Sequence, residues 1–175
     1  MTSIDSRYLE NAYNLARRSY EEGGIPIGSV LVSGDKVIGA GYNRRVQDGD
    51  PIAHGEMDAI RKAGRRKNYA ETTLYTSLSP CMMCAGTIVQ FGIPRVVIGE
   101  NENFGGTEDF LRKYGVEVIV VGHERRPKPP IDCAEALKRS ASAPIWAHLF
   151  RRLPVYPLFP YFTLAQVASA AARSA

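Results

Sequence analysis

The chain has 175 residues, of which 45% are hydrophobic and 23% are charged, and its net charge is +4. These values fit a globular domain with a sizeable core. The three cysteines do not form a disulfide framework, and residues 1–22 lack the basic-then-apolar pattern of a signal peptide. We therefore expect a protein of the reducing cytoplasm.

Periodicity and turn residues predict alternating helices and strands along the first two thirds of the chain. Apolar residues recur at helical spacing from Tyr8 to Tyr20, and Gly23 and Gly24 end that helix. The predicted helices cover about 8–20, 54–63, 81–91 and 108–114, and the predicted strands cover 27–33, 37–42, 73–77, 95–99 and 117–121. Gly34 and Asp35 predict a hairpin between the first two strands. The later alternation predicts parallel pairing, with helices on both faces of one sheet.

The most informative motif combines one histidine with two cysteines. His54 opens the second predicted helix, and Cys81 and Cys84 follow Pro80 at the start of the third. Two cysteines three residues apart in a first helical turn point to the same side. The helix N-terminus also favours their thiolates. One imidazole and two thiolates predict a Zn²⁺ site, and three ligands leave the fourth tetrahedral position for water.

Glu56 is the predicted catalytic residue. It lies two residues after His54, so it can reach the open position without binding the metal. A carboxylate there can take a proton from the attacking water and deliver it to the substrate.

Either half of this pattern alone is weak. A lone C-x-x-C could be a redox pair, and a lone H-x-E could arise by chance. A zinc ribbon would need a second ligand pair, but Cys133 stands alone, and His123 and His148 lack partner spacing. Together, in this order, the two halves match the signature of zinc nucleobase deaminases.

From about Tyr8 to Val121 the chain resembles the cytidine deaminase-like superfamily, and within it the yeast-type cytosine deaminases that act on the free base. The resemblance rests on the segments EGGIPIGSVLV, GYNRR, HGEMDAIRKAGR, TTLYTSLSPCMMCAGTIVQFGIPRVVIGENENF and LRKYGVEVIVV. It implies a three-layer α/β/α sandwich with a central five-stranded mixed sheet. It also implies a zinc deaminase domain over residues 1–123 and a homodimer.

The resemblance further implies a set of substrate contacts. Asn43 would hydrogen-bond the pyrimidine, and Gly55 would offer its backbone N–H to the ring carbonyl. Ile27 and Phe104 would pack against the ring, and the carbonyl of Ser79 would face the leaving amino group. From the residues alone, Asn43 could equally be a turn residue after a strand, and Phe104 could belong to the core.

Charge favours a small substrate over a polynucleotide. Residues 124–175 hold eight Lys/Arg and three Asp/Glu, a net charge of +5, so residues 1–123 carry −1 of the total of +4. A nucleic-acid enzyme is expected to have a basic stripe near its active site, but this region offers only short clusters such as Arg65-Arg66-Lys67. We therefore expect a nucleobase substrate and no nucleic-acid partner.

The resemblance ends after Val121. Yeast-type cytosine deaminases close over the substrate with a tail that bears a tryptophan and an aspartate, whereas Trp146 is followed three residues later by Leu149. Residues 124–175 are expected to form a divergent C-terminal helix and apolar tail. The uncharged stretch Leu153–Ala172 is long enough to span a membrane, but Pro154, Pro157 and Pro160 argue against a span. It could be a docked arm, a disordered end or the product of a reading-frame change.

The sequence thus predicts zinc-dependent hydrolysis of cytosine to uracil and ammonia. Two alternatives remain open. The first keeps the chemistry but acts on adenosine in tRNA, on guanine or on a nucleoside. The second is a metal-stabilised binding protein without activity. Gly55, Asn43 and GENENF favour cytosine, and Glu56 argues against the binding protein.

Overall fold

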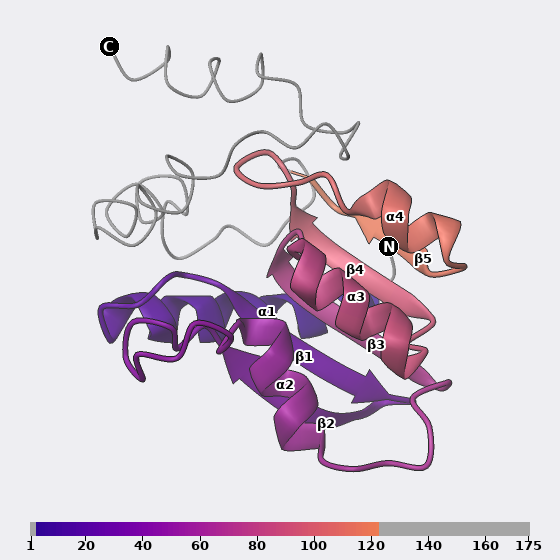
Figure 1. Ribbon diagram of the computed structural model, residues 1–175, viewed down its shortest axis with the longest axis horizontal. Coiled ribbons are helices and arrows are strands. Elements are labelled where there is room, and N and C mark those ends of the chain that lie inside the picture. The colour runs from indigo at the N-terminus through magenta and orange to yellow at the C-terminus, as the bar shows by residue number, and fades with distance from the viewer. Residues whose placement is uncertain (1–2, 123–175) are drawn as a thin grey trace. The chain divides into compact units, whose positions relative to one another are not determined.

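The computed structural model describes residues 3–122, which fall within one compact unit and form nine regular elements (Figure 1). The helices are α1 (Ser3–Glu21), α2 (Gly55–Ala63), α3 (Met82–Phe91) and α4 (Glu108–Lys113); the strands are β1 (Gly28–Ser33), β2 (Lys36–Tyr42), β3 (Thr72–Leu78), β4 (Arg95–Glu100) and β5 (Glu117–Val120). The expectations for the region 124–175, including Cys133, Trp146 and the uncharged stretch, lie outside the described residues. Within residues 3–122, no helix is both long enough and apolar enough to cross a membrane.

The strands form one mixed sheet in the order β2-β1-β3-β4-β5. The predicted hairpin is confirmed, because β1 and β2 pair antiparallel and turn at Gly34, whose φ is 60°. The pairs β3–β4 and β4–β5 are parallel, as the alternation predicts, whereas β1 pairs with β3 antiparallel. The hairpin explains this exception: β2 runs in the same direction as β3 but lies at the sheet edge, with β1 between them.

Helices cover both faces of the sheet, so the predicted three-layer sandwich is confirmed (Figure 1). Successive strand residues point to opposite faces, and they feed two separate apolar clusters. On one face α1 packs against the sheet through Tyr8, Ala12, Val30, Val32, Tyr75 and Val97. On the other face α2, α3 and α4 share a larger cluster that includes Leu31, Ile60, Leu74, Ile88, Val96 and Leu111.

Two glycines of β2 allow α2 to approach the sheet closely. A Cβ atom at Gly39 would overlap the carbonyl oxygen of Ala59, and one at Gly41 would overlap its backbone nitrogen. Bare backbone is therefore required where the helix crosses this strand. The close approach fixes the depth of α2, whose first turn carries predicted site residues.

A buried ion pair joins α1 to the N-terminal end of β4. The guanidinium of Arg95 donates to the carboxylate of Asp5 at 2.9 Å, and the hydroxyl of Tyr75 donates to the same carboxylate at 2.9 Å. The side chain of Asp5 is 4% exposed, so the pair is shielded from solvent and held by several hydrogen bonds. This contact lies at the opposite end of β4 from Glu100, where the site segments follow.

Candidate metal centre and active site

The N-termini of α2 and α3 carry the predicted metal ligands. The sequence predicts helices that begin at His54 and Cys81. In the structure these two residues are the N-caps, and each helix begins one residue later. Neither side chain makes a capping hydrogen bond. Serine, threonine, aspartate and asparagine are the usual N-caps. A histidine and a cysteine at these positions instead leave their side chains free to meet between the two helices.

The three predicted ligands form a compact triangle. The Sγ atoms of Cys81 and Cys84 lie 3.4 and 3.6 Å from Nδ1 of His54, and 3.7 Å from each other. For tetrahedral zinc with normal bond lengths, the expected separations are about 3.6 Å between nitrogen and sulfur and about 3.8 Å between two sulfurs. The donor set and its spacing therefore fit a zinc ion. Among residues 3–122, these three residues form the group that could hold a metal.

The electrostatics of the triangle favour a bound cation. The hydrogen bond from Cys84, opposed by burial and aided by His54, lowers the pKa of Cys81 to about 4. Donating that hydrogen bond, together with burial and the nearby Glu56, raises the pKa of Cys84. Burial opposes charging of His54, but its contact with the Cys81 thiolate raises its pKa. A cation between the three groups would favour the thiolate form of both cysteines.

Glu56 lies in the first turn of α2, directly beside this triangle. Glu56 is 2% exposed, and its carboxyl contacts the thiol of Cys84. Burial raises the pKa of Glu56 to about 7, so its carboxyl can accept and release a proton near neutrality. Of the residues that the structure describes, those that could hold a metal are His54, Cys81 and Cys84, and Glu56 is not among them.

Asn43 and Ile27 form a single backbone unit at the end of the β1–β2 hairpin. The backbone N–H of Asn43 donates to the carbonyl of Ile27 at 2.8 Å, and the hydroxyl of Ser19 donates to the carbonyl of Asn43 at 2.6 Å. Asn43 is 1% exposed. Its Oδ1 accepts the backbone N–H of Arg45 at 3.2 Å, which fixes the orientation of the amide and leaves its Nδ2 hydrogens as donors.

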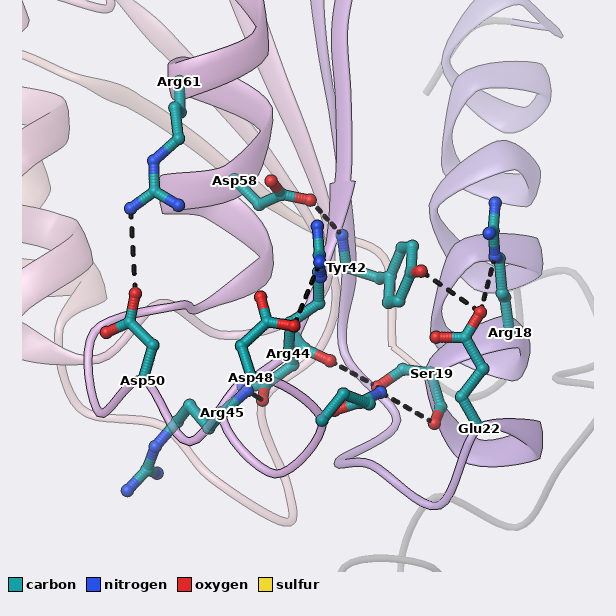
Figure 2. A network of polar contacts seen from close by, with 12 residues as sticks. Arg18, Ser19, Glu22, Tyr42, Arg44, Arg45, Asp48, Asp50, Asp58 and Arg61 are labelled. Atoms are coloured by element: carbon teal, nitrogen blue, oxygen red, sulfur yellow. Dashed lines mark hydrogen bonds and ion pairs between the residues drawn. The ribbon is translucent and has the colours of Figure 1, made fainter.

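A polar network anchors this unit to α1 and α2 (Figure 2). The carboxylate of Glu22 accepts hydrogen bonds from Arg18 at 2.9 Å and from the hydroxyl of Tyr42 at 3.2 Å. On the other side, Asp58 accepts the backbone N–H of Tyr42 at 3.3 Å and pairs with Lys62 at 2.7 Å. The residue before Asn43 is therefore held by both helices, which limits the movement of the asparagine.

Gly55 lies against the same unit. A Cβ atom here would stand 3.1 Å from the carbonyl oxygen of Ile27 and 3.3 Å from Oγ of Ser29. An alanine would fit only if these neighbours moved by a few tenths of an ångström. The structure thus brings Ile27, Asn43 and Gly55 together beside Glu56.

The remaining predicted contacts, Ser79 and Phe104, belong to the segments after β3 and β4. Ser79 is 3% exposed, and its backbone N–H donates to the carbonyl of Glu100 at 2.9 Å. Phe104 is half-buried in the loop between β4 and α4. This loop is tied to the segment before Cys81, because the hydroxyl of Thr107 donates to the carbonyl of Pro80 at 2.7 Å.

The sequence did not single out two buried acids in this region. Glu100 is 1% exposed and Glu108 is 7% exposed. Glu100 accepts several hydrogen bonds from the loop, and Glu108 accepts one from the loop and one from the hydroxyl of Ser79. By residue type, glutamates are expected at the surface. The available signal was the position of Glu100 directly after the predicted apolar strand 95–99, within GENENF.

Fold and site together define a zinc hydrolase of the deaminase type. The cytidine and deoxycytidylate deaminase zinc-binding region matches residues 2–100. Cytosine deaminase of Candida albicans is 51% identical over 122 residues, which cover 68% of this chain and 81% of that protein. The tRNA-specific adenosine deaminase of Buchnera aphidicola is 42% identical over 112 residues, covering 62% and 74%.

A solved structure from a study of A-to-I editing by tRNA:A34 deaminases superposes with a TM-score of 0.59 at 30% identity, covering 65% of this chain and 96% of that chain. The chain belongs to the cytidine and deoxycytidylate deaminase family of zinc-dependent hydrolases. Zinc is accordingly its cofactor.

Proposed function

We propose that the protein hydrolyses free cytosine to uracil and ammonia. The observation that carries this proposal is the buried carboxyl of Glu56 beside a three-ligand zinc site and directly after Gly55. The higher identity to a cytosine deaminase, 51% against 42% for a tRNA-specific adenosine deaminase, supports the choice of base.

The proposed ligands are His54, Cys81 and Cys84, and a zinc ion held by them would supply a polarised water beside Glu56. Glu56 takes a proton from that water and delivers it to N3 of cytosine, while the oxygen adds to C4. Glu56 then moves the proton of the new C4 hydroxyl to the amino group, the C4–N bond breaks, and ammonia leaves as the C4 carbonyl of uracil forms. A pKa near neutrality suits both transfers.

The proposed recognition of the base uses groups that are already held in place. The amide Nδ2 of Asn43 donates to the ring carbonyl, since its oxygen is occupied by the N–H of Arg45. The backbone N–H of Gly55 supplies a second donor. Ile27 and Phe104 enclose the ring, and the carbonyl of Ser79 accepts from the amino group. Preformed donors reduce the ordering cost of binding a small polar ligand.

The distribution of basic residues supports a small substrate over RNA. Arg61, Arg65, Arg66 and Lys67 line a hollow of about 650 Å³ together with Tyr69 and Phe91. This hollow lies at the C-terminal ends of α2 and α3, whereas the metal ligands lie at the N-terminal ends of the same helices. The cluster is therefore not placed to hold a polynucleotide over the zinc.

Deamination of adenosine in tRNA is the second candidate, because a tRNA-specific adenosine deaminase shares 42% identity with this chain. The two candidates differ in whether the flanking nucleotides contribute to binding. A free base offers only its ring to the site, and a tRNA loop also offers phosphates.

A substrate panel tests the proposal. Zinc-loaded protein is incubated with cytosine, cytidine, adenine, guanine and an anticodon stem-loop, and ammonia release is followed. We expect cytosine to be hydrolysed fastest. The Glu56→Gln variant, which should bind zinc without turnover, is the negative control. Ammonia from the stem-loop alone would move the assignment to tRNA editing. No ammonia from any of them would favour a binding protein.

We further propose that the protein works as a homodimer in the reducing cytoplasm, where both thiols stay available for zinc. Helix α3 contains no charged residue, and Met82 and Phe91 at its ends are 49% and 46% exposed. An uncharged helix with exposed apolar ends is suited to pack against a second copy. Light scattering at micromolar concentration should give twice the mass of 19.3 kDa, and a monomeric mass would contradict the dimer.

A further inference from the structure

The loop of residues 101–107 is joined to the segment that precedes the metal ligands. At one end, the backbone N–H of Ser79 donates to the carbonyl of Glu100 at 2.9 Å. At the other, the hydroxyl of Thr107 donates to the carbonyl of Pro80 at 2.7 Å. Phe104 lies between these two contacts in the chain. Two of the proposed base contacts, Phe104 and the Ser79 carbonyl, therefore belong to one hydrogen-bonded unit.

The first half of this loop is shaped by the carboxylate of Glu100. Its Oε2 accepts the backbone N–H groups of Glu102 at 2.8 Å and of Asn103 at 3.1 Å. Its Oε1 accepts the side-chain amide of Asn103 at 3.0 Å. Three donors on one carboxylate fix the turn that leads directly into Phe104.

The second half is shaped by the carboxylate of Glu108. Its Oε1 accepts the hydroxyl of Ser79 at 2.9 Å, and its Oε2 accepts the backbone N–H of Gly106 at 2.8 Å. Burial opposes its ionisation, but backbone N–H groups and the Ser79 hydroxyl together lower the pKa of Glu108. The charged carboxylate thus spans from the loop to the segment that bears Ser79.

Both carboxylates are buried, yet neither forms an ion pair with any residue in the described part of the chain. A buried charge is costly unless hydrogen bonds replace its water. Here those bonds come from a loop without regular structure and from one hydroxyl. Charge-assisted bonds are stronger than neutral ones, so a single loop conformation is favoured.

We propose that Glu100 and Glu108 are positioning residues that set the affinity for the base by holding Phe104 and the carbonyl of Ser79 against it. This inference rests on the proposed function, because it assumes that those two groups contact the substrate. Neither acid touches the reacting atoms. Their substitution is therefore expected to change KM more than kcat.

The principal test is Glu108→Gln. Glutamine keeps one oxygen for the Ser79 hydroxyl but presents an amide NH₂ to the N–H of Gly106, so two donors face each other. The loss of a charge-assisted hydrogen bond predicts a KM for cytosine raised about tenfold or more. We expect kcat within about threefold and an unchanged zinc content, since Glu56 and the metal ligands are untouched.

The matched control is Asp109→Asn. Asp109 is the next residue of α4, its side chain is 97% exposed, and it pairs with Arg112 at the surface at 3.0 Å. Removing its charge should leave KM and kcat unchanged. A rise in KM equal to that of Glu108→Gln would overturn the proposal, because it would attribute the effect to the net charge of α4.

A double-mutant cycle identifies the pathway of the effect. Ser79→Ala removes the hydroxyl that Glu108 accepts but keeps the backbone carbonyl. If Glu108 acts through Ser79 and the loop, the effects of the two substitutions overlap. The fold-increase in KM of the double variant is then smaller than the product of the two single fold-increases. Strictly multiplicative effects would overturn this route. A lower melting temperature with unchanged KM would reduce both acids to a structural role.

Hydrogen exchange tests the positioning without substrate. Glu108→Gln should accelerate exchange of the Gly106 amide, and Glu100→Gln should do the same for Glu102 and Asn103, while amides of α1 keep their rates. Unchanged rates at those amides would overturn the positioning role. If wild-type protein instead deaminates another base, the proposed function fails while the KM for that base tests the two glutamates in the same way.

Discussion

The two ends of α2 and α3 differ sharply, although both helices run through one core. At the metal end, defined by His54, Cys81 and Cys84, the first two residues are half-buried, Cys84 is buried, and the three ligand atoms lie within 4.8 Å of one another. At the basic end, defined by the hollow around Arg65, Arg66 and Lys67, the charged side chains are exposed. The same helices therefore support chemistry at one end and a solvated surface at the other.

The helix caps show the same contrast. At the basic end, α2 and α3 finish at Gly64 and Gly92, with φ values of 71° and 67° that suit glycine. At the metal end, the caps are histidine and cysteine, which give no side-chain cap. An N-cap replacement of this kind typically costs about 0.5–2 kcal/mol. Local stability is thus given up at the two helix starts that carry the predicted ligands.

The largest expected effect comes from breaking the metal end with Cys84→Ser. We expect zinc content to fall below about one tenth of an equivalent and turnover to be lost, because thiolate is the better ligand for zinc. The melting temperature should also fall, since bound metal stabilises the folded state by mass action. Elemental analysis and thermal unfolding measure both. Cys133→Ser is the control, and equal zinc loss there would contradict the ligand assignment.

Glu56→Gln should separate metal binding from proton transfer. Glutamine has nearly the same shape but cannot carry a proton, so we expect normal zinc content and a kcat reduced by about 10³-fold, within the range for general acid/base groups. Ammonia release and metal analysis on one preparation decide the result. Turnover above one tenth of the wild-type rate would remove Glu56 from its proposed role.

Much of this arrangement could be predicted, because strong local patterns govern it. Strand β4 was expected over 95–99 and covers Arg95–Glu100, and α3 begins one residue later than expected. The start of α1 at Ser3 was missed, since its first turn lacks the apolar spacing that marks the helix from Tyr8 onward. Element interiors carry periodicity, whereas their ends depend on neighbours.

The rest depends on contacts between distant segments. Antiparallel pairing of β1 with β3 follows from which edge β2 occupies, and alternation of helices and strands does not encode that choice. The roles of Glu100 and Glu108 arise only when the loop after β4 meets Ser79. From the sequence alone, a charged residue is expected at the surface, and only the tertiary structure shows that it is buried.

Asn43→Asp sharpens the assignment of substrate contacts at the metal end. Aspartate keeps Oδ1 for the N–H of Arg45 but replaces the Nδ2 donors by an acceptor. Losing a donor to the ring carbonyl costs about 1–3 kcal/mol, so KM for cytosine should rise about tenfold or more. Steady-state kinetics measure it, and Asn11→Asp on α1 is the control. An unchanged KM would make Asn43 a turn residue only.

Away from the metal end, Tyr75→Phe should affect stability and leave turnover intact. Burial, together with the hydrogen bond to Asp5 and its charge, raises the pKa of Tyr75 to about 12. Unfolded tyrosine ionises near about 10, so the contribution of this group is complete below that pH and is lost as pH rises toward 12. Phenylalanine does not ionise, so the stability of the variant does not include this loss. The stability gap between wild type and variant, measured by urea unfolding from pH 9 to 11, should therefore shrink with rising pH, and a widening gap would refute the shift.

The smallest effect is expected from neutralising the basic end with Arg65→Gln, Arg66→Gln and Lys67→Gln together. Cytosine is uncharged, and the cluster lies at the opposite ends of the helices from the zinc ligands, so kcat/KM should change less than about twofold at physiological salt. An RNA substrate that used this cluster would behave differently, because each lost phosphate contact weakens binding and reduces its salt dependence. Kinetics with cytosine at two salt concentrations, beside binding of the anticodon stem-loop, distinguish the two cases. A large loss of kcat/KM for cytosine would mean that the two ends of these helices are coupled, which nothing in their separate hydrogen-bond networks requires.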